Sequence, residues 1–257
     1  MATYFVNIDS IVRKIWGKAD TILFIFAGAS AEFALNKSVD WLYFTGKLPS
    51  DPLGRLFSTV NYSRQILFSE YDAALRSIDQ ITAIHKGVEA NRGTQIPDSA
   101  YLDVLYLLID YSIRSYELLE RPLSEDEKEE VFEVFYRVGK RMALKNLPTN
   151  YVDWCIQREE QLGYSLCRGN LTYDLYLQYK KQLGIIRFHL LKQAQLLVVP
   201  HRVNKLLRLG KIRCLLPVLY VYKFFRLIKL QNILKNAILP PAYVNQVKEM
   251  DTAPNYS

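Results

Sequence analysis

Apolar residues recur three or four positions apart along most of the chain, which is the spacing of a helix that faces a core. The clearest stripe consists of Leu102, Leu105, Leu108, Ile109, Ser112, Ile113 and Tyr116. No segment alternates apolar and polar residues with a period of two, and no hairpin dipeptide such as Asn-Gly occurs. The pattern therefore predicts an all-α protein in which Leu105 points inward.

Helix boundaries follow from capping residues and helix breakers. Asp20 and Ser69 are predicted to cap the helices that follow them, Ser124 and Glu127 fit a capping box, and Pro200 ends a long helix. The expected helices cover residues 8–18, 20–37, 69–90, 98–120, 125–142, 151–165 and 172–199, with another near residue 55 and basic helices after residue 200.

The chain is long enough and apolar enough to build one large core. It has 257 residues, of which 50% are hydrophobic, and it contains no internal repeat and no low-complexity linker. We expect a single all-α domain over residues 1–240, which ends at Pro240 and Pro241. The polar residues 241–257 are predicted to form a flexible tail.

Charge is distributed unevenly along the chain. The net charge is +7, yet no Asp or Glu occurs between Asp174 and Glu249, where 14 Lys and Arg residues lie. This basic segment, residues 175–248, is also rich in apolar residues, which favours a surface that faces anionic lipid or covers an acidic or apolar ligand. An equally good account is that it neutralises the acidic remainder of one fold. Nucleic acid is not expected as a partner, because the aromatic residues lie among aliphatic ones at core-like spacing.

Neither a membrane span nor a secretion signal is predicted. Two apolar runs, residues 21–31 and 215–222, are eleven and eight residues long, well short of the roughly 20 that a spanning helix needs, so both are expected to be buried helices. The first nine residues lack a basic region followed by an apolar one. Three cysteines without a C-x-x-C pair are expected to be free thiols. These features predict a cytoplasmic protein. The basic segment adds the expectation of peripheral membrane association.

Several catalytic motifs are absent. The chain has no G-x-S-x-G, no P-loop and no dinucleotide-binding glycine pattern. A carboxylate di-iron bundle needs Glu three residues before His, but the residues at that position are Thr82, Ile186 and Val198. The zinc motif H-E-x-x-H is also missing.

Three polar residues in apolar surroundings remain as candidates. Glu32 and Asp110 each interrupt an apolar helix, so each carboxylate must be paired or must face a cavity, and structural pairing is the commoner case. His85 lies among aliphatic residues, where a histidine more often belongs to the core or its rim than to a metal site.

Several short blocks, taken in order, resemble a family of oxygenases that includes rubber oxygenase (latex-clearing protein) and the MpaB-type enzymes. The resemblance covers roughly residues 20–210, and its most specific blocks are Asp51-Pro-Leu-Gly-Arg55 and Ile84-His-Lys-Gly-Val88. The other blocks begin at Ala29, Leu108, Arg114, Arg121, Tyr136, Leu147 and Leu196.

The resemblance implies an oxidoreductase with an all-α, globin-like core that binds haem b and uses dioxygen on an apolar small molecule. It makes His85 the expected iron ligand and places His85, Glu32, Arg55 and Asp110 at the cofactor. A haem site needs an apolar slot, an axial ligand and basic groups for the propionates.

The chain departs from the family pattern at two positions. Leu105 stands where the family often has a histidine in its long helix, and leucine cannot ligate iron. Glu32 stands where an Ala-His-Pro sequence is common. His189 is a second ligand candidate, although a core position is the commoner reading for it. The alternative function is a non-catalytic relative that binds an apolar ligand, or a membrane through its basic C-terminal half.

Overall fold

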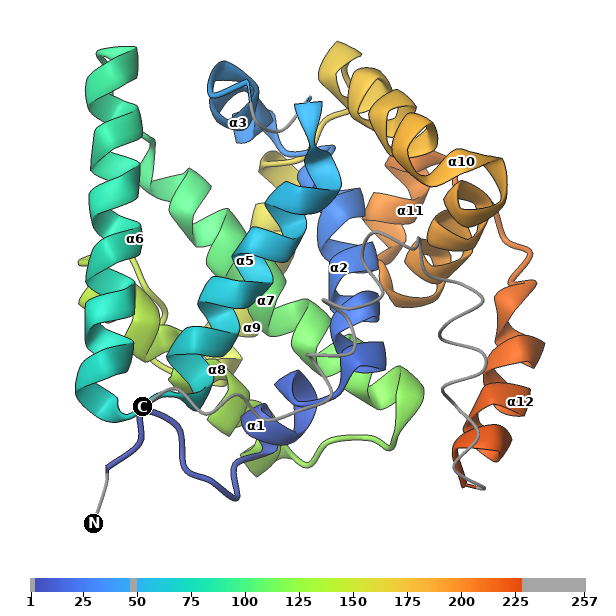
Figure 1. The fold of residues 1–257 in the computed structure, drawn as a ribbon, viewed down its shortest axis with the longest axis horizontal. Helices are drawn as coiled ribbons and strands as arrows, with labels where there is room; N and C mark the ends of the chain where they lie inside the picture. Colours follow the sequence, from blue (N-terminus) through green and yellow to red (C-terminus); the bar gives the residue numbers. More distant parts are fainter. Residues whose placement is uncertain (1–2, 47–49, 228–257) are drawn as a thin grey trace.

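The computed structural model describes residues 3–46 and 50–227, and within them the regular structure is helical (Figure 1). Two isolated bridges, Tyr4 with Glu70 and Asn36 with Leu166, are the only strand-like pairings in this part of the chain. The helices are α1 (Ile11–Trp16), α2 (Ala19–Phe33), η1 (Lys37–Val39), α3 (Asp40–Phe44), α5 (Pro52–Phe68), α6 (Tyr71–Arg92), α7 (Asp98–Leu119), α8 (Glu125–Arg141), α9 (Tyr151–Tyr164), α10 (Asn170–Val198), α11 (His201–Leu207) and α12 (Leu215–Leu227). The all-α prediction is confirmed, whereas the globin-like core stays a prediction.

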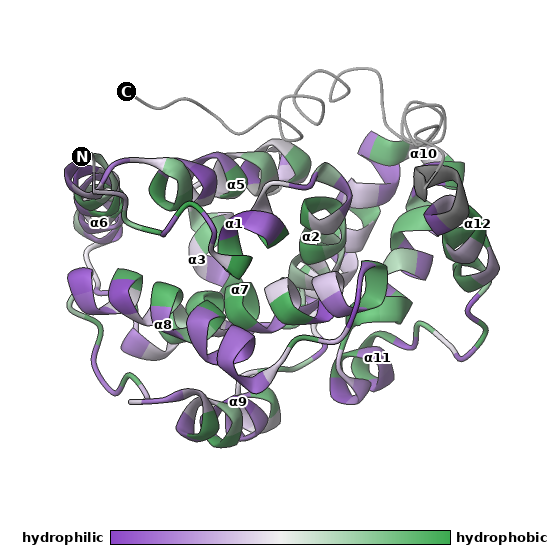
Figure 2. Cartoon of the chain, turned by 90° about the horizontal axis from the view of Figure 1, so that it is seen from below, coloured by the Kyte–Doolittle hydropathy of each residue, from purple (hydrophilic) through white to green (hydrophobic). Residues whose placement is uncertain are grey.

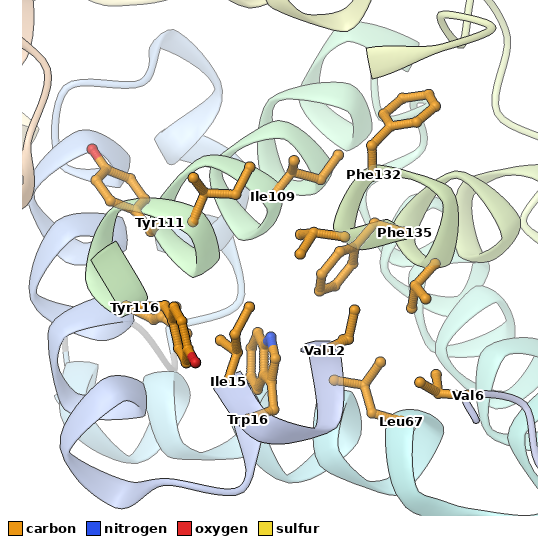
Figure 3. Packing of buried hydrophobic residues seen from close by; sticks show 14 of the residues in the cluster. Val6, Val12, Ile15, Trp16, Leu67, Ile109, Tyr111, Tyr116, Phe132 and Phe135 are labelled. Atoms are coloured by element: carbon orange, nitrogen blue, oxygen red, sulfur yellow. The ribbon is translucent and has the colours of Figure 1, made fainter. Parts of the chain in front are cut away.

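Helices α2 and α7 form the centre of the molecule and pack against each other more extensively than any other described pair. Helix α10 covers α2 on one side, while α8 packs on α7 and α5 pairs with α6 at the opposite end (Figure 1). Trp16 of α1 is buried between these layers, and its indole Nε1 donates to Ser112 Oγ at 3.0 Å. Phe135 of α8 lies against Trp16 with ring centroids 6.1 Å apart (Figure 3). A single apolar core therefore joins α1, α7 and α8.

Helix ends confirm one predicted cap and correct two others. The capping box of α8 is present, because Ser124 Oγ accepts from the Glu127 amide and the Glu127 side chain accepts from the Ser124 amide. The prediction for Asp20 was wrong: Lys18 is the cap of α2, and Asp20 lies within the first turn. The prediction for Ser69 was also wrong, since Glu70 is the cap of α6. The Ser69 hydroxyl instead donates back to the Gln65 carbonyl in the last turn of α5, so it closes the preceding helix.

Over residues 175–227, the described part of the basic segment is less regular than its sequence suggests. Helix α10 is kinked at Gly184, which has φ of 73° and ψ of 174°, a backbone conformation that glycine adopts without strain. Helix α12 is only half buried: Leu219 and Tyr222 face inward, while Val218, Tyr220 and Val221 are exposed. The expectation that residues 215–222 are a buried helix was therefore wrong, whereas the run over residues 21–31 is largely buried in α2 as predicted.

No helix between residues 3 and 46 or between 50 and 227 combines the length and apolar character that crossing a membrane requires. The three cysteines are free, as predicted. The end of the predicted domain and the predicted tail, residues 228–257, fall outside the described residues.

Candidate functional site

A buried ionic network joins the two central helices to α9. Arg158 extends from α9 to both carboxylates: its Nη1 and Nη2 lie 2.6 Å from Glu32 Oε1 and Oε2, and its Nη2 lies 2.8 Å from Asp110 Oδ2. The side chains of Glu32, Arg158 and Asp110 are 1%, 4% and 9% exposed. Arg114 adds a second cation, with Nε at 2.6 Å from Asp110 Oδ1. The predicted pairing of Glu32 and Asp110 is therefore what the structure shows.

Neutral groups complete the hydrogen bonding of this network. The Tyr111 hydroxyl donates to Glu32 Oε2 at 2.8 Å. Gly28 makes room for the Tyr111 ring, because a Cβ at Gly28 would lie 2.1 Å from ring atom Cδ1. Gln161 accepts from Arg158 and donates to Asp103 Oδ1 at 2.7 Å, so the polar contacts continue along α9 and α7.

Electrostatics favour the ionised forms of Asp110 and Arg158. Burial alone would raise the pKa of Asp110, but the guanidinium groups of Arg158 and Arg114 outweigh it, and the pKa lies below its ordinary value. Burial would lower the pKa of Arg158, and the facing carboxylates of Glu32 and Asp110 raise it well above its ordinary value. Both oxygens of Glu32 and both of Asp110 are already engaged, so this end of the core does not fit an iron group.

Sequence reasoning missed Arg158 and Gln161. A signal was present, because Trp154, Arg158, Gln161 and Leu162 recur at helical spacing and all four are buried in α9. An arginine on the inward stripe of a helix requires a buried counterion, and Glu32 and Asp110 are the carboxylates that supply it.

His85 lies elsewhere, on α6, and faces the start of α7. Its ring is 5.2 Å from the ring of Tyr101, at an interplanar angle of 60°. Its Nδ1 is buried and has no hydrogen-bond partner among the described residues. A buried polar atom without a partner costs free energy, so this nitrogen favours a partner that the described residues do not supply.

Arg55 of α5 is the cation next to His85. Its Nη1 donates to Thr59 Oγ1 at 2.9 Å, and no carboxylate in the described part of the chain pairs with it. Burial lowers the pKa of Arg55. Burial, and then the charge of Arg55, lower the pKa of His85, while Glu89 opposes them. The result is a neutral imidazole beside a cation that lacks an acidic partner.

Leu105 and His189 complete the account of the predicted positions. Leu105 is buried as expected and contacts α8, since a Cβ at Gly139 would lie 2.9 Å from Leu105 Cδ2. His189 is exposed on α10, so the prediction of a core position was wrong. It follows the kink at Gly184, where α10 bends.

The four predicted site residues thus separate into two pairs. Glu32 and Asp110 meet at Arg158, whereas His85 and Arg55 lie at the junction of α5, α6 and α7. Within residues 3–46 and 50–227, no hydrogen bond or ion pair joins the two pairs. In the same part of the chain, no three His, Cys, Asp or Glu side chains cluster as a metal site. Of the two pairs, only the His85 pair has a ring nitrogen that no hydrogen bond engages among the described residues.

Comparison with known families agrees with the blocks noted above. Residues 16–161 match the family described as ER-bound oxygenase mpaB/B'/Rubber oxygenase, catalytic domain. No curated protein and no solved structure matches the chain. The match includes α2, the α5–α6 pair, α7 and most of α9, and therefore both residue pairs. Because it covers more than half of the 257 residues, the chain belongs to the mpaB/rubber oxygenase catalytic-domain family.

Proposed function

We propose that this protein is an oxygenase-type oxidoreductase that acts on an apolar small molecule and holds haem b through His85. The observation that carries the proposal is an unsatisfied imidazole nitrogen beside Arg55, a cation without an acidic partner in the described residues, inside a chain of an oxygenase family. Under this proposal, the other two predicted site residues, Glu32 and Asp110, do not bind the cofactor and contribute by stabilising the core.

The chemistry of the two side chains suits their proposed roles. A lowered pKa keeps the His85 imidazole neutral at pH 7, and only the neutral ring has a lone pair for a metal. Arg55 is always protonated in water and its planar guanidinium matches a carboxylate, so it is suited to bind a propionate. When bound, haem iron supplies the activation of dioxygen.

The surroundings of His85 fit an apolar substrate. Ile81 lies one turn before His85 on α6, and Leu102 follows Tyr101 on α7; both are partly buried against the core. Aliphatic side chains favour an apolar molecule through the area they remove from water. Tyr101 is held in place, because its hydroxyl donates to Glu89 Oε1 at 3.2 Å, and its ring limits the approach to the imidazole.

The test is the absorption spectrum and iron content of protein purified from cells grown with iron and a haem precursor. We expect a Soret band in the wild type, its loss or shift in His85→Ala, and no change in the control His189→Ala, since His189 is exposed on α10. No Soret band and no bound metal in the wild type would overturn the proposal. An unchanged band in His85→Ala would exclude His85 as the ligand.

A second candidate function is a non-catalytic relative that keeps the fold and binds an apolar molecule without a cofactor. It is favoured by Leu105, which fills the space against Gly139, and by the fully engaged oxygens of Glu32. The same spectrum separates the two candidates: the second requires a folded, monodisperse wild type without haem or iron under conditions where a haem-binding control protein is fully loaded.

A further inference from the structure

A basic cavity lies beyond the part of the chain that matches the oxygenase family. It has a volume of about 340 Å³ and is lined by Arg168, Arg202, Lys205, Leu206 and Arg208. Arg168 lies in the turn between α9 and α10, and the other four belong to α11 or its C-cap. The cavity therefore combines four cationic side chains with one apolar residue.

Neutral groups hold the cations of this cavity. The Arg202 Nη2 donates to the Gly163 carbonyl at 2.6 Å, and the Arg168 guanidinium lies 4.6 Å from the centre of the Tyr173 ring. Within residues 3–46 and 50–227, none of the four cations forms an ion pair with a carboxylate. Four adjacent uncompensated charges repel one another, so the cavity favours an anionic occupant.

Apolar side chains project from the chain immediately after the cavity. Ile212 is 77% exposed in the loop that follows Arg208, with Lys211 and Arg213 on either side. Helix α12 comes next, and its outward face carries Val218, Tyr220 and Val221. Figures 1 and 2 show α11, this loop and α12 together at one end of the molecule, where the ribbon of α12 is largely hydrophobic.

We propose that this end of the molecule docks on an anionic membrane, with the cavity holding the phosphate of a lipid headgroup and Ile212 and the outer face of α12 contacting the bilayer. Cations beside exposed aliphatic and aromatic residues are typical of interfacial binding. Nucleic acid would use the cations but not the aliphatic side chains.

The docking surface is independent of the proposed oxygenase function. All of its residues follow Gln161, where the family match ends. They belong to α11, α12 and the segments next to them, whereas His85 lies on α6 and Arg55 on α5. A protein without haem can therefore still bind the membrane, and a haem-loaded protein can fail to bind it.

The test is co-sedimentation of the whole protein with vesicles of phosphatidylcholine alone or with added phosphatidylserine. The matched variants are Lys205→Glu/Arg208→Glu, at the cavity, and Lys180→Glu/Lys181→Glu, on the exposed surface of α10. Both pairs change the net charge by the same amount, and all four residues are exposed.

We expect the wild type to bind the phosphatidylserine vesicles at low salt and to lose affinity as salt rises. The cavity variant should bind at least about tenfold more weakly, since each basic side chain at an anionic surface contributes several-fold to affinity. The α10 variant should stay within about twofold of the wild type. If the cavity variant unfolds, Lys205→Gln/Arg208→Gln removes the charges without adding carboxylates and should show the same ranking. The proposal is overturned if the wild type binds vesicles equally well with and without phosphatidylserine, or if both variants lose affinity equally. It is also overturned if single-stranded RNA, but not vesicles, binds the wild type and binds the cavity variant more weakly.

Discussion

The Glu32–Arg158–Asp110 network and the His85–Arg55 pair both place charged or titratable groups within an apolar helical protein. Burial of such groups costs desolvation free energy, and the two regions differ in how far hydrogen bonds and ion pairs offset it. In the network, each carboxylate oxygen and the guanidinium have partners at 2.6–3.1 Å. At His85, the Nδ1 atom has no hydrogen-bond partner and the Arg55 guanidinium has a neutral partner, Thr59, but no carboxylate within the described residues. In a saturated buried network, removal of any one partner is strongly destabilising and no group is left to bind a ligand, whereas an unsaturated pair costs stability and retains that capacity.

The largest effect is expected for Arg158→Met. The substitution leaves the carboxylates of Glu32 and Asp110 buried without their shared cation, which costs about 3–5 kcal/mol of unfolding free energy. Urea unfolding followed by circular dichroism measures it. Arg121→Met is the control, because Arg121 pairs with Glu127 on the surface and such pairs contribute about 1 kcal/mol or less. Equal losses in the two variants would mean that the buried network is not a stabilising feature.

Gly28→Ala should have the next largest effect. The new methyl group would lie 2.1 Å from Tyr111 Cδ1, so the Tyr111 ring must move and its hydrogen bond to Glu32 is lost; overpacking of this kind costs about 1–3 kcal/mol. The control is Gly87→Ala in α6, where nothing lies within 4 Å of the added Cβ. This control should gain about 0.5–1 kcal/mol from helix propensity. Thermal unfolding measures the two changes in unfolding free energy, which should have opposite signs. If Gly28→Ala leaves the unfolding free energy unchanged, the Tyr111 ring has room to shift.

Arg55→Met should change the free energy of unfolding by less than about 1 kcal/mol, or raise it, because it removes a partly buried charge that has no acidic partner. The same change should weaken haem retention, since a propionate would lose its cation. Urea unfolding and haem titration measure the two effects separately. A loss of unfolding free energy as large as that of Arg158→Met would contradict the expected difference between the two regions.

The smallest effect is a pH dependence of stability at His85. The pKa of His85 in the folded protein lies below 6.5, its ordinary value, because of burial and Arg55. The unfolded chain therefore binds a proton at a pH where the folded chain does not, and stability falls as pH drops below about 6.5. His85→Gln should lose less stability between pH 7 and pH 5 than the wild type does, while His189→Gln should behave like the wild type. Parallel melting curves at each pH provide the measurement; identical losses in wild type and His85→Gln would contradict it.

Local sequence signals predicted the fold well and the site only in part. Apolar spacing and the Ser124–Glu127 capping box identified α7 and α8 with ends close to those observed, because both signals are local. The short elements η1 and α3 and the kink at Gly184 were missed, since they depend on how neighbouring segments meet. Glu32 and Asp110 stood out as carboxylates in apolar helices. Arg158 lies on the inward stripe of α9 and could also have been identified, but which carboxylates it pairs with depends on how the three helices meet in space.

The same separation along the chain has a consequence for folding. Arg158 lies 126 residues from Glu32 and 48 from Asp110, so the three groups meet only after α2, α7 and α9 have come together. A compact intermediate that brings two of them into the core without the third buries a net charge. Because such a buried charge costs free energy, misregistered arrangements of these helices are disfavoured relative to the native one. We expect the network to form late in folding and to favour the native packing of α2, α7 and α9.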